Sequence, residues 1–275
     1  MKKLLTTLCL SLLMVTAANA ADDKEAVWKD LKYDLFAERQ ISSKAEWLTM
    51  EAPYRAHDAA LVPIRIEAQL PKEGQYIKFL TLVIDNNPAP VAATMELSPK
   101  TGPLMIETRL RINEYSHVRA IAETNDGQLF MVAKYVKAAG GCSAPAMKDL
   151  DAKMAALGKM KLRQFTPKAT PANVKMQSVR EAQLMVRHPN YSGLQLNQET
   201  GYYIPAHYVS NVEISVDGEL LIKLEGAISL SEDPTLRFRF LSKASSPVMA
   251  VTVKDTKQQT YTNKWELKAT GEVGS

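Results

Sequence analysis

The chain has 275 residues, of which 46% are hydrophobic and 7% aromatic, a composition typical of one large or two ordinary globular domains. Its formal net charge is only +4, and lysines are mixed with acidic residues along the whole sequence. Because there is no basic block, the sequence gives no support to nucleic-acid binding.

The first twenty residues have the three parts of a secretory signal peptide. Lys2 and Lys3 form a basic start, residues 4–17 are apolar, and residues 18–20 are a small-residue cleavage site. We therefore expect export to the periplasm, with cleavage after Ala20 and no membrane anchor. Cleavage also removes Cys9 and leaves a single cysteine in the exported protein.

The mature chain is expected to begin with a helix over Asp22–Glu38. Val27, Trp28, Leu31 and Leu35 recur at helical spacing and form one apolar stripe. This pattern favours a helix that covers the edge or end of a sheet.

From Leu61 the hydrophobic period changes from 3.6 to 2, which is typical of half-buried strands. The preceding segment 42–53 is predicted to be irregular. Short strands at regular spacing, with no helices between them, indicate an antiparallel β-sandwich. The strands are expected over 61–68, 76–84, 91–97, 104–112, 118–122 and 129–136.

A helical pattern returns after this first sandwich. Met147, Leu150, Met154 and Leu157 predict a helix over 146–162. The Thr/Pro-rich segment up to Pro171 then predicts a semi-rigid linker.

The β-pattern resumes after the linker and predicts a second sandwich of about seven strands. Its clearest hairpin turns at Asp217-Gly218, between alternating apolar residues on both sides. The predicted fold is therefore all-β, with two immunoglobulin-like antiparallel β-sandwiches joined by a short helix and a Thr/Pro linker, and preceded by a helix. The expected divisions are a signal peptide (1–20), a first sandwich (21–145), a helix and linker (146–171), a second sandwich (172–268) and a flexible tail (269–275).

Known catalytic and cofactor motifs are not found in the sequence. It contains no nucleophile elbow, phosphate loop or dinucleotide fingerprint. The four histidines are scattered without metal-ligand spacing. We therefore expect no cofactor, no metal and no catalytic centre. Arginines that alternate with apolar residues are interpreted as solvated strand faces, and these are Arg109, Arg111, Arg237 and Arg239.

The candidate reactive group is the thiol of Cys142, which lies in the stretch Gly140-Gly141-Cys142-Ser143 at the end of the first predicted sandwich. Two glycines before a lone thiol suggest a flexible arm. A single exported cysteine suggests either intermolecular pairing or a functional thiol. The alternative is a buried small hydrophobic residue, and the loop context favours function. If Ser143 caps the following helix, the helix dipole is expected to lower the pKa of Cys142 below about 8.5.

Several motifs resemble the SoxY and SoxZ subunits of a periplasmic sulfur-oxidation carrier. The SoxY-like stretches are Leu61-Val62-Pro63-Ile64, Asp85-Asn86-Asn87-Pro88-Ala89-Pro90, Glu107-Thr108-Arg109-Leu110-Arg111 and Gly140-Gly141-Cys142. The SoxZ-like stretches are Val186-Arg187-His188-Pro189, residues 201–206, the hairpin at Asp217-Gly218 and Asp233-Pro234. Together they cover nearly the whole mature chain, in order, as in fused SoxYZ-like carriers associated with quinoprotein (pyrroloquinoline quinone) dehydrogenases.

The resemblance implies a non-catalytic carrier in thiosulfate and sulfur oxidation. It places the covalent sulfur intermediate on Cys142, with Gly140, Gly141 and Ser143 as the arm. The SoxY-like and SoxZ-like halves would pair within the chain, and the partners would be sulfur-oxidation cytochromes or a quinoprotein dehydrogenase. In the family the arm is typically a free C-terminal tail, whereas here a second domain follows it. Two alternatives remain, a non-covalent adaptor or assembly factor for a quinoprotein dehydrogenase and a structural sandwich with a buried thiol.

Overall fold

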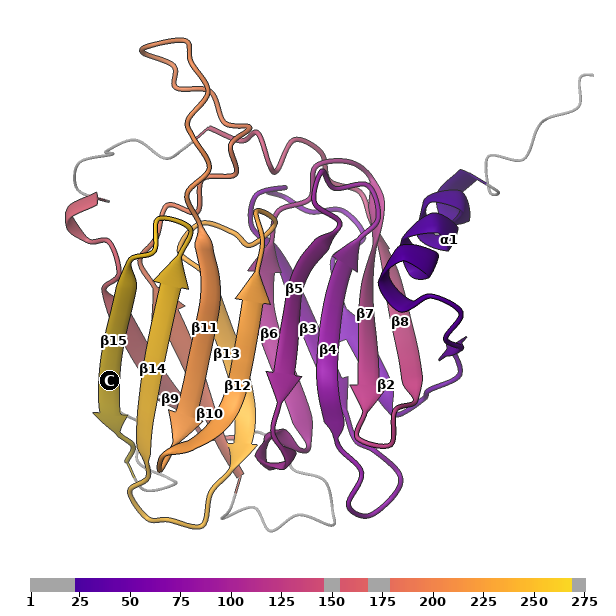
Figure 1. Cartoon of the computed structure of the whole chain (residues 1–275), viewed down its shortest axis with the longest axis vertical. Helices are drawn as coiled ribbons and strands as arrows, with labels where there is room; N and C mark the ends of the chain where they lie inside the picture. The colour runs from indigo at the N-terminus through magenta and orange to yellow at the C-terminus, as the bar shows by residue number, and fades with distance from the viewer. Residues whose placement is uncertain (1–22, 146–153, 168–178, 269–275) are drawn as a thin grey trace, which may run out of the picture.

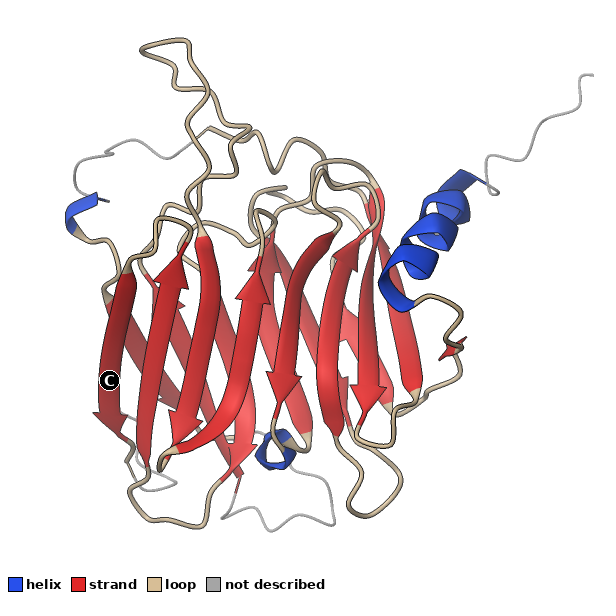
Figure 2. Cartoon of the chain, in the orientation of Figure 1, coloured by secondary structure: helices blue, strands red, loops and turns tan. Residues whose placement is uncertain are grey.

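The computed structural model describes residues 23–145, 154–167 and 179–268 and consists of two stacked β-sheets (Figures 1 and 2). A helix, α1 (Asp23–Phe36), lies at one end of the stack, and a short 3₁₀ turn, η1 (Pro99–Thr101), connects two strands. The predicted signal peptide, residues 146–153 of the predicted helix, most of the linker and the tail lie outside the described residues.

The larger sheet has nine strands and the smaller has six. The larger sheet is ordered β1 (Ile41–Ser42), β8 (Leu129–Val136), β7 (Ser116–Thr124), β4 (Ile77–Ile84), β5 (Val91–Leu97), β12 (Glu219–Gly226), β11 (Val209–Val216), β14 (Val248–Asp255) and β15 (Thr260–Glu266). The smaller sheet is ordered β2 (Leu48–Glu51), β3 (Val62–Ala68), β6 (Leu104–Leu110), β13 (Thr235–Leu241), β10 (Val179–Val186) and β9 (Met160–Phe165). Neighbouring strands are antiparallel, except that β1 pairs with β8 in parallel.

The structure confirms the all-β immunoglobulin-like fold and adds a feature that sequence periodicity does not reveal. Both sheets run without a break from the first half of the chain into the second. In the larger sheet β5 pairs with β12, with Leu97 opposite Ile222, and in the smaller sheet β6 pairs with β13, with Glu107 opposite Arg237. The two halves therefore form one extended sandwich (Figure 1).

The space between the sheets is filled by one continuous core. Alternate residues of β3, beginning with Val62 and Ile64, point into it, as the period-2 pattern predicts. The same cluster includes Phe238 and Phe240 of β13, so residues of both halves are buried together. Complete burial of a side chain of this size contributes roughly 1.5–3 kcal/mol. The halves are thus held together by a shared core as well as by strand pairing.

Helix α1 packs on the outer face of the nine-stranded sheet. Trp28 is buried against Val83, Ile121 and Leu129 of three adjacent strands. The buried stripe is narrower than the sequence pattern predicts, because Val27 and Leu35 stay largely exposed while Trp28 and Leu31 contact the sheet. No helix in the described part of the chain is long and apolar enough to span a membrane.

Two segments differ from the secondary structure expected from sequence. Strand β2 lies in the segment predicted to be irregular, where it pairs with β3. The end of the predicted 146–162 helix is instead the start of β9, where Met160 pairs with Val186 and Leu162 with Leu184. Met160 and Leu162 alternate with lysines, so this short segment fits the hydrophobic period of a strand as well as that of a helix. Pairing with the edge of β10 makes it a strand.

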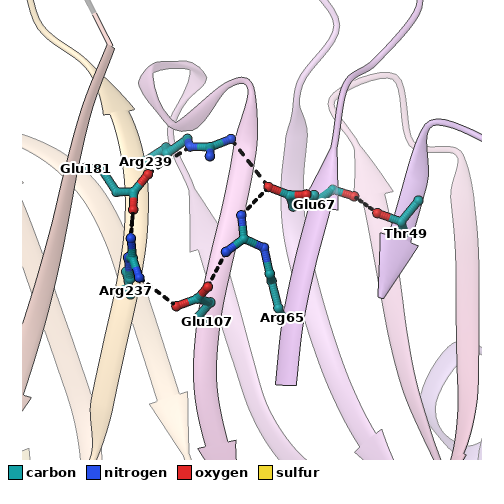
Figure 3. A network of polar contacts seen from close by, with 7 residues as sticks. All are labelled: Thr49, Arg65, Glu67, Glu107, Glu181, Arg237 and Arg239. Atoms are coloured by element: carbon teal, nitrogen blue, oxygen red, sulfur yellow. Dashed lines mark hydrogen bonds and ion pairs between the residues drawn. The ribbon is translucent and has the colours of Figure 1, made fainter. Parts of the chain in front are cut away.

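A network of charged side chains crosses the junction on the outer face of the smaller sheet (Figure 3). Glu181 is buried and accepts hydrogen bonds from Arg237 and from Arg239, the latter at 3.1 Å. Arg237 also contacts Glu107, and Arg239 contacts Glu67, each at 3.4 Å. Arg65 joins Glu67 to Glu107 within the first half. The network therefore connects β10 and β13 of the second half to β3 and β6 of the first.

The position of Glu181 predicts that Glu181→Gln destabilises the protein by about 2–3 kcal/mol, because it leaves two largely covered guanidinium groups without their shared carboxylate. The matched control is Glu219→Gln, which removes an exposed pair with Lys100 that also crosses the junction and should cost less than about 1 kcal/mol. Urea unfolding of both variants measures the difference. Equal losses would show that the burial of Glu181 adds nothing to the stabilising effect of its ion pairs.

Candidate functional site

The segment after β8 is bound to the end of the first half rather than free in solvent. The backbone N–H of Lys137 donates to the carbonyl of Tyr54 (2.8 Å). Farther along, the N–H of Gly140 donates to Asn113 (2.8 Å) and the N–H of Gly141 to Ile112 (2.9 Å). Residues 137–145, called the arm below, cross the end of the sandwich toward the long loop between β10 and β11 (Figure 1).

The two glycines are needed for this docking, each for a different reason. Gly140 has φ +78°, a left-handed conformation that other residues adopt only with strain. At Gly141 a Cβ atom would lie 2.1 Å from the carbonyl oxygen of Ala59 and 2.6 Å from that of Ile112. Only glycine allows the backbone to approach these carbonyls so closely. The pair predicted as a flexible tether therefore also shapes a docked conformation.

The second half of the chain holds the arm from the other side. The Ser192 hydroxyl donates to the carbonyl of Cys142, and Nε2 of Gln195 donates to the carbonyl of Ala144 (3.0 Å). Both residues belong to the loop between β10 and β11, which is called the clamp loop below (residues 187–208). The arm thus lies at the junction, bonded to both halves.

Cys142 is completely buried in this arrangement. Burial raises the pKa of its thiol to about 11, although the nearby Arg111 acts in the opposite direction. The expected lowering of the pKa by a helix N-terminus is therefore wrong for the docked arm. Ser143 is exposed, and its hydroxyl donates to the carbonyl of Gly140 at 3.3 Å. Residues 146–153, where the expected helix would begin, lie outside the described residues.

Arg111 is a site residue that sequence reasoning placed on a solvated face. Its side chain is only 2% exposed. It donates to the carbonyl of Gly141 (3.1 Å) and to that of Asn190 (3.4 Å), so it connects the arm to the clamp loop. Strand β6 ends at Leu110, and both Arg111 and Ile112 are buried because strict alternation ends with the strand.

Asn87, in the predicted turn after β4, fixes the backbone around Arg111 through the hydrogen bonds of its side chain. Its amide group donates to the carbonyl of Arg111 (2.7 Å) and to the hydroxyl of Ser229 (2.9 Å). Its side-chain oxygen accepts the backbone N–H of Asn113 (2.8 Å). A turn residue in the sequence is thus a buried side chain that fixes the strand end beneath the arm.

Two of the scattered histidines come together beside the clamp loop. His188 and His207 are buried with Asp255, and their three potential ligand atoms lie within 4.8 Å of one another. Nε2 of His207 lies 2.9 Å from Oδ2 of Asp255, and Nε2 of His188 lies 3.5 Å from the same oxygen. The spacing of these residues in sequence does not indicate their meeting, because it depends on where three strand ends converge.

The hydrogen bonds of His188 bear on whether this cluster holds a metal ion. The backbone N–H of Asn190 donates to Nδ1 of His188 (3.1 Å), so the proton of the neutral ring lies on Nε2 and faces Asp255. A metal bound at Nε2 would require the proton on Nδ1, opposite another N–H group. Nε2 of His188 has no hydrogen-bond partner among the described residues, whereas Nε2 of His207 is hydrogen-bonded to Asp255. The tautomer set by Asn190 therefore argues against a metal ion at Nε2 of His188. Asn190 joins this network to Arg111.

The fold and the site define a two-layer β-sandwich with a cysteine arm docked at the junction of its halves. Comparison with protein families matches residues 32–142 to the sulfur oxidation protein SoxY and residues 168–266 to the sulphur oxidation protein SoxZ. The chain is therefore a SoxYZ-like protein in which a SoxY domain is followed by a SoxZ domain. Both families are sulfur-oxidation carrier proteins.

Comparisons with individual proteins add less. Among solved structures, the sulfur carrier protein SoxY from Chlorobium limicola f thiosulfatophilum is 18% identical, with a TM-score of 0.35, and the match covers 42% of this chain and 94% of that one. A superoxide reductase (neelaredoxin) from Ignicoccus hospitalis is 16% identical with a TM-score of 0.29, covering 33% of this chain and 78% of that one. No curated protein matches the sequence.

The docking of the arm predicts that Cys142 reacts slowly with a neutral alkylating reagent and that Gly141→Ala speeds the reaction at least about tenfold. The added Cβ would collide with two backbone carbonyls, and a penalty of ~1.4 kcal/mol suffices for this factor. Gly127→Ala is the control, because it strains the backbone at a φ of +81° away from the arm, while the added Cβ meets nothing within 4 Å. Alkylation rates near neutral pH give the comparison. Equal rates in the two variants would contradict the role of Gly141.

The histidine network predicts a loss of stability in acid. Burial, with His207 nearby, lowers the pKa of His188 from 6.5 to about 4. The unfolded chain therefore binds the proton first, so this contribution is complete above about pH 6.5 and is lost as the pH falls toward 4, amounting to about 3 kcal/mol. Urea unfolding at a series of pH values should show a flatter pH dependence in His188→Gln than in the wild type. The exposed His57→Gln should leave the dependence unchanged, and an unchanged slope in His188→Gln would refute the assignment.

Proposed function

We propose that this protein is a periplasmic carrier that holds a sulfur-containing intermediate covalently on Cys142 and presents it to partner redox enzymes. The observation that carries the proposal is the end of the SoxY match at Cys142, on a Gly-Gly arm that directly follows the last strand of the SoxY domain. Cys142 is also the free cysteine of the described chain. A carrier function of this kind requires a thiol but no catalytic centre.

The docked arm suits the resting state of such a carrier. A completely buried thiol with a raised pKa is protected from oxidants and unwanted exchange, because the thiolate is the reactive form. Loading then requires release of the arm, which exposes the sulfur and restores an ordinary pKa. Release breaks a small number of hydrogen bonds. These are chiefly the bonds donated by the backbone N–H groups of Gly140 and Gly141 and by the side chains of Ser192 and Gln195.

The proposed setting follows from the predicted signal peptide and the family resemblance. In the periplasm the partners would be sulfur-oxidation cytochromes or a quinoprotein dehydrogenase. The shared sheets support the pairing of the two domains within one chain. A partner that approaches the junction would contact the arm and the clamp loop together. Because Ser192 and Gln195 of the clamp loop are hydrogen-bonded to the arm, the arm is released only when these bonds break.

A second candidate is a non-covalent adaptor or assembly factor for a quinoprotein dehydrogenase. The observation that favours it is the burial of the thiol, which the arm and the clamp loop cover from both sides. In this function Cys142 would fill space at the junction and carry no cargo. The two candidates differ in whether the sulfur atom is ever modified.

Intact-mass measurement of protein purified from its native periplasm distinguishes them. The carrier function predicts a fraction of molecules with added sulfur or sulfur and oxygen atoms, sensitive to reductant and absent from Cys142→Ser. It also predicts that this variant folds normally but does not support sulfur oxidation. Unmodified protein that still binds its dehydrogenase would overturn the carrier proposal in favour of the adaptor.

A further inference from the structure

Arg111 is a buried cation without a carboxylate partner in the described part of the chain. Two of its N–H groups donate to the carbonyls of Gly141 and Asn190, while Nε has no partner among the described residues. Arg119, which is equally buried, is paired instead with the carboxylate of Asp85 at 2.8 Å. A guanidinium has five N–H donors and a full charge, so Arg111 retains capacity for an anion.

Cys142 is the titratable group whose ionisation would affect the pKa of Arg111 most. Burial lowers the pKa of Arg111, and an ionised Cys142 opposes this effect, ahead of Glu232 and Asp58. The same interaction opposes the rise in the pKa of Cys142. The contact with the carbonyl of Gly141 places the guanidinium next to the residue that precedes the thiol. The hydrogen bond places the guanidinium beside the arm, and the electrostatic interaction links its charge to that of Cys142.

We propose that Arg111 forms a receptor for a negatively charged sulfur group on Cys142, so that the arm docks more tightly with an anionic adduct than with a neutral one. The inference rests on the carrier function proposed above and adds a specificity-determining residue. A monoanionic group on the sulfur would give Arg111 a counter-ion that the described residues do not supply.

Space for such a group has to come from the clamp loop. Gly141 is fixed against backbone carbonyls, whereas the other side of the arm is covered by side-chain hydrogen bonds from Ser192 and Gln195. Ser143 and Pro145, which follow Cys142 in the sequence, are exposed. A shift of the clamp loop would admit the adduct while Arg111 keeps its contact with the arm. Arg111 is therefore a specificity-determining residue that acts on the charge of the cargo.

The test compares two adducts of one thiol in the intact mature protein. Tetrathionate reacts with the Cys142 thiolate at a central sulfur, forms Cys–S–S–SO₃⁻ and releases thiosulfate. Methyl methanethiosulfonate forms the neutral Cys–S–S–CH₃ and releases methanesulfinate. Intact mass confirms each product. Hydrogen exchange of the Gly140 and Gly141 amides, which are bonded only in the docked arm, then reports docking.

We expect the arm amides to be protected at least about tenfold better with the anionic adduct than with the neutral one, as one charge-assisted hydrogen bond allows. Arg111→Gln should abolish this difference, and Arg111→Lys should restore part of it. The control is Arg180→Gln, another buried arginine bonded to backbone carbonyls, which should leave the difference intact.

Equal protection of the two adducts in the wild type, or an unchanged difference in Arg111→Gln, would overturn the proposal. If Arg111→Gln does not fold, Arg111→Lys and the wild-type pair of adducts still decide, because a wild-type difference of less than about twofold is enough to reject it. Both adducts are installed chemically, so the result does not depend on natural cargo. Failure of the carrier function would appear separately, in the mass of the native protein.

Discussion

Strand pairing across the junction is the constraint on which the rest of the structure depends. β5 with β12 and β6 with β13 join edges that would otherwise expose unpaired backbone groups in each half. Once these edges meet, the core becomes continuous, and the two arginines that share the buried carboxylate of Glu181 can also pair with Glu107 and Glu67 of the first half. The same alignment brings the end of β6 to the clamp loop, and the site forms where they meet.

The arm shows how one segment can serve two opposite requirements. The proposed carrier function requires the thiol to be reachable, yet Cys142 is buried and the arm around it is hydrogen-bonded to both halves of the protein. Gly140 and Gly141 satisfy both, since residues without side chains dock closely against carbonyls and also move freely when released. Fusion of the domains anchors the arm at both ends, so that the clamp loop and the arm remain together. Release is then a local event in a rigid sandwich.

Much of the fold followed from the hydrophobic period. Helix α1 and the strands β3 to β8 lie close to their predicted positions, because each has one face in the core and one in solvent or under the helix. β2 and β9 were missed, since short edge strands are defined by their neighbours more than by their own residues. The Gly-Gly-Cys motif could be recognised from the sequence, because two glycines precede the single cysteine of the mature chain. The roles of Arg111, Asn87 and the histidine network were not, because each side chain leaves the regular alternation at the end of a strand.

The sequence by itself determined the all-β class and the place of the thiol at the end of the first predicted sandwich, while the order of the SoxY and SoxZ domains came from the resemblance of its motifs to those families. The class depends on residues that are close in the chain, where period and turn chemistry act directly. Tertiary structure alone decided that Cys142 is buried, that Arg111 contacts the arm at Gly141 and that His188 meets His207 and Asp255. Such contacts join residues far apart in sequence. Burial and pKa follow from the surrounding atoms, which the folded arrangement of both halves supplies.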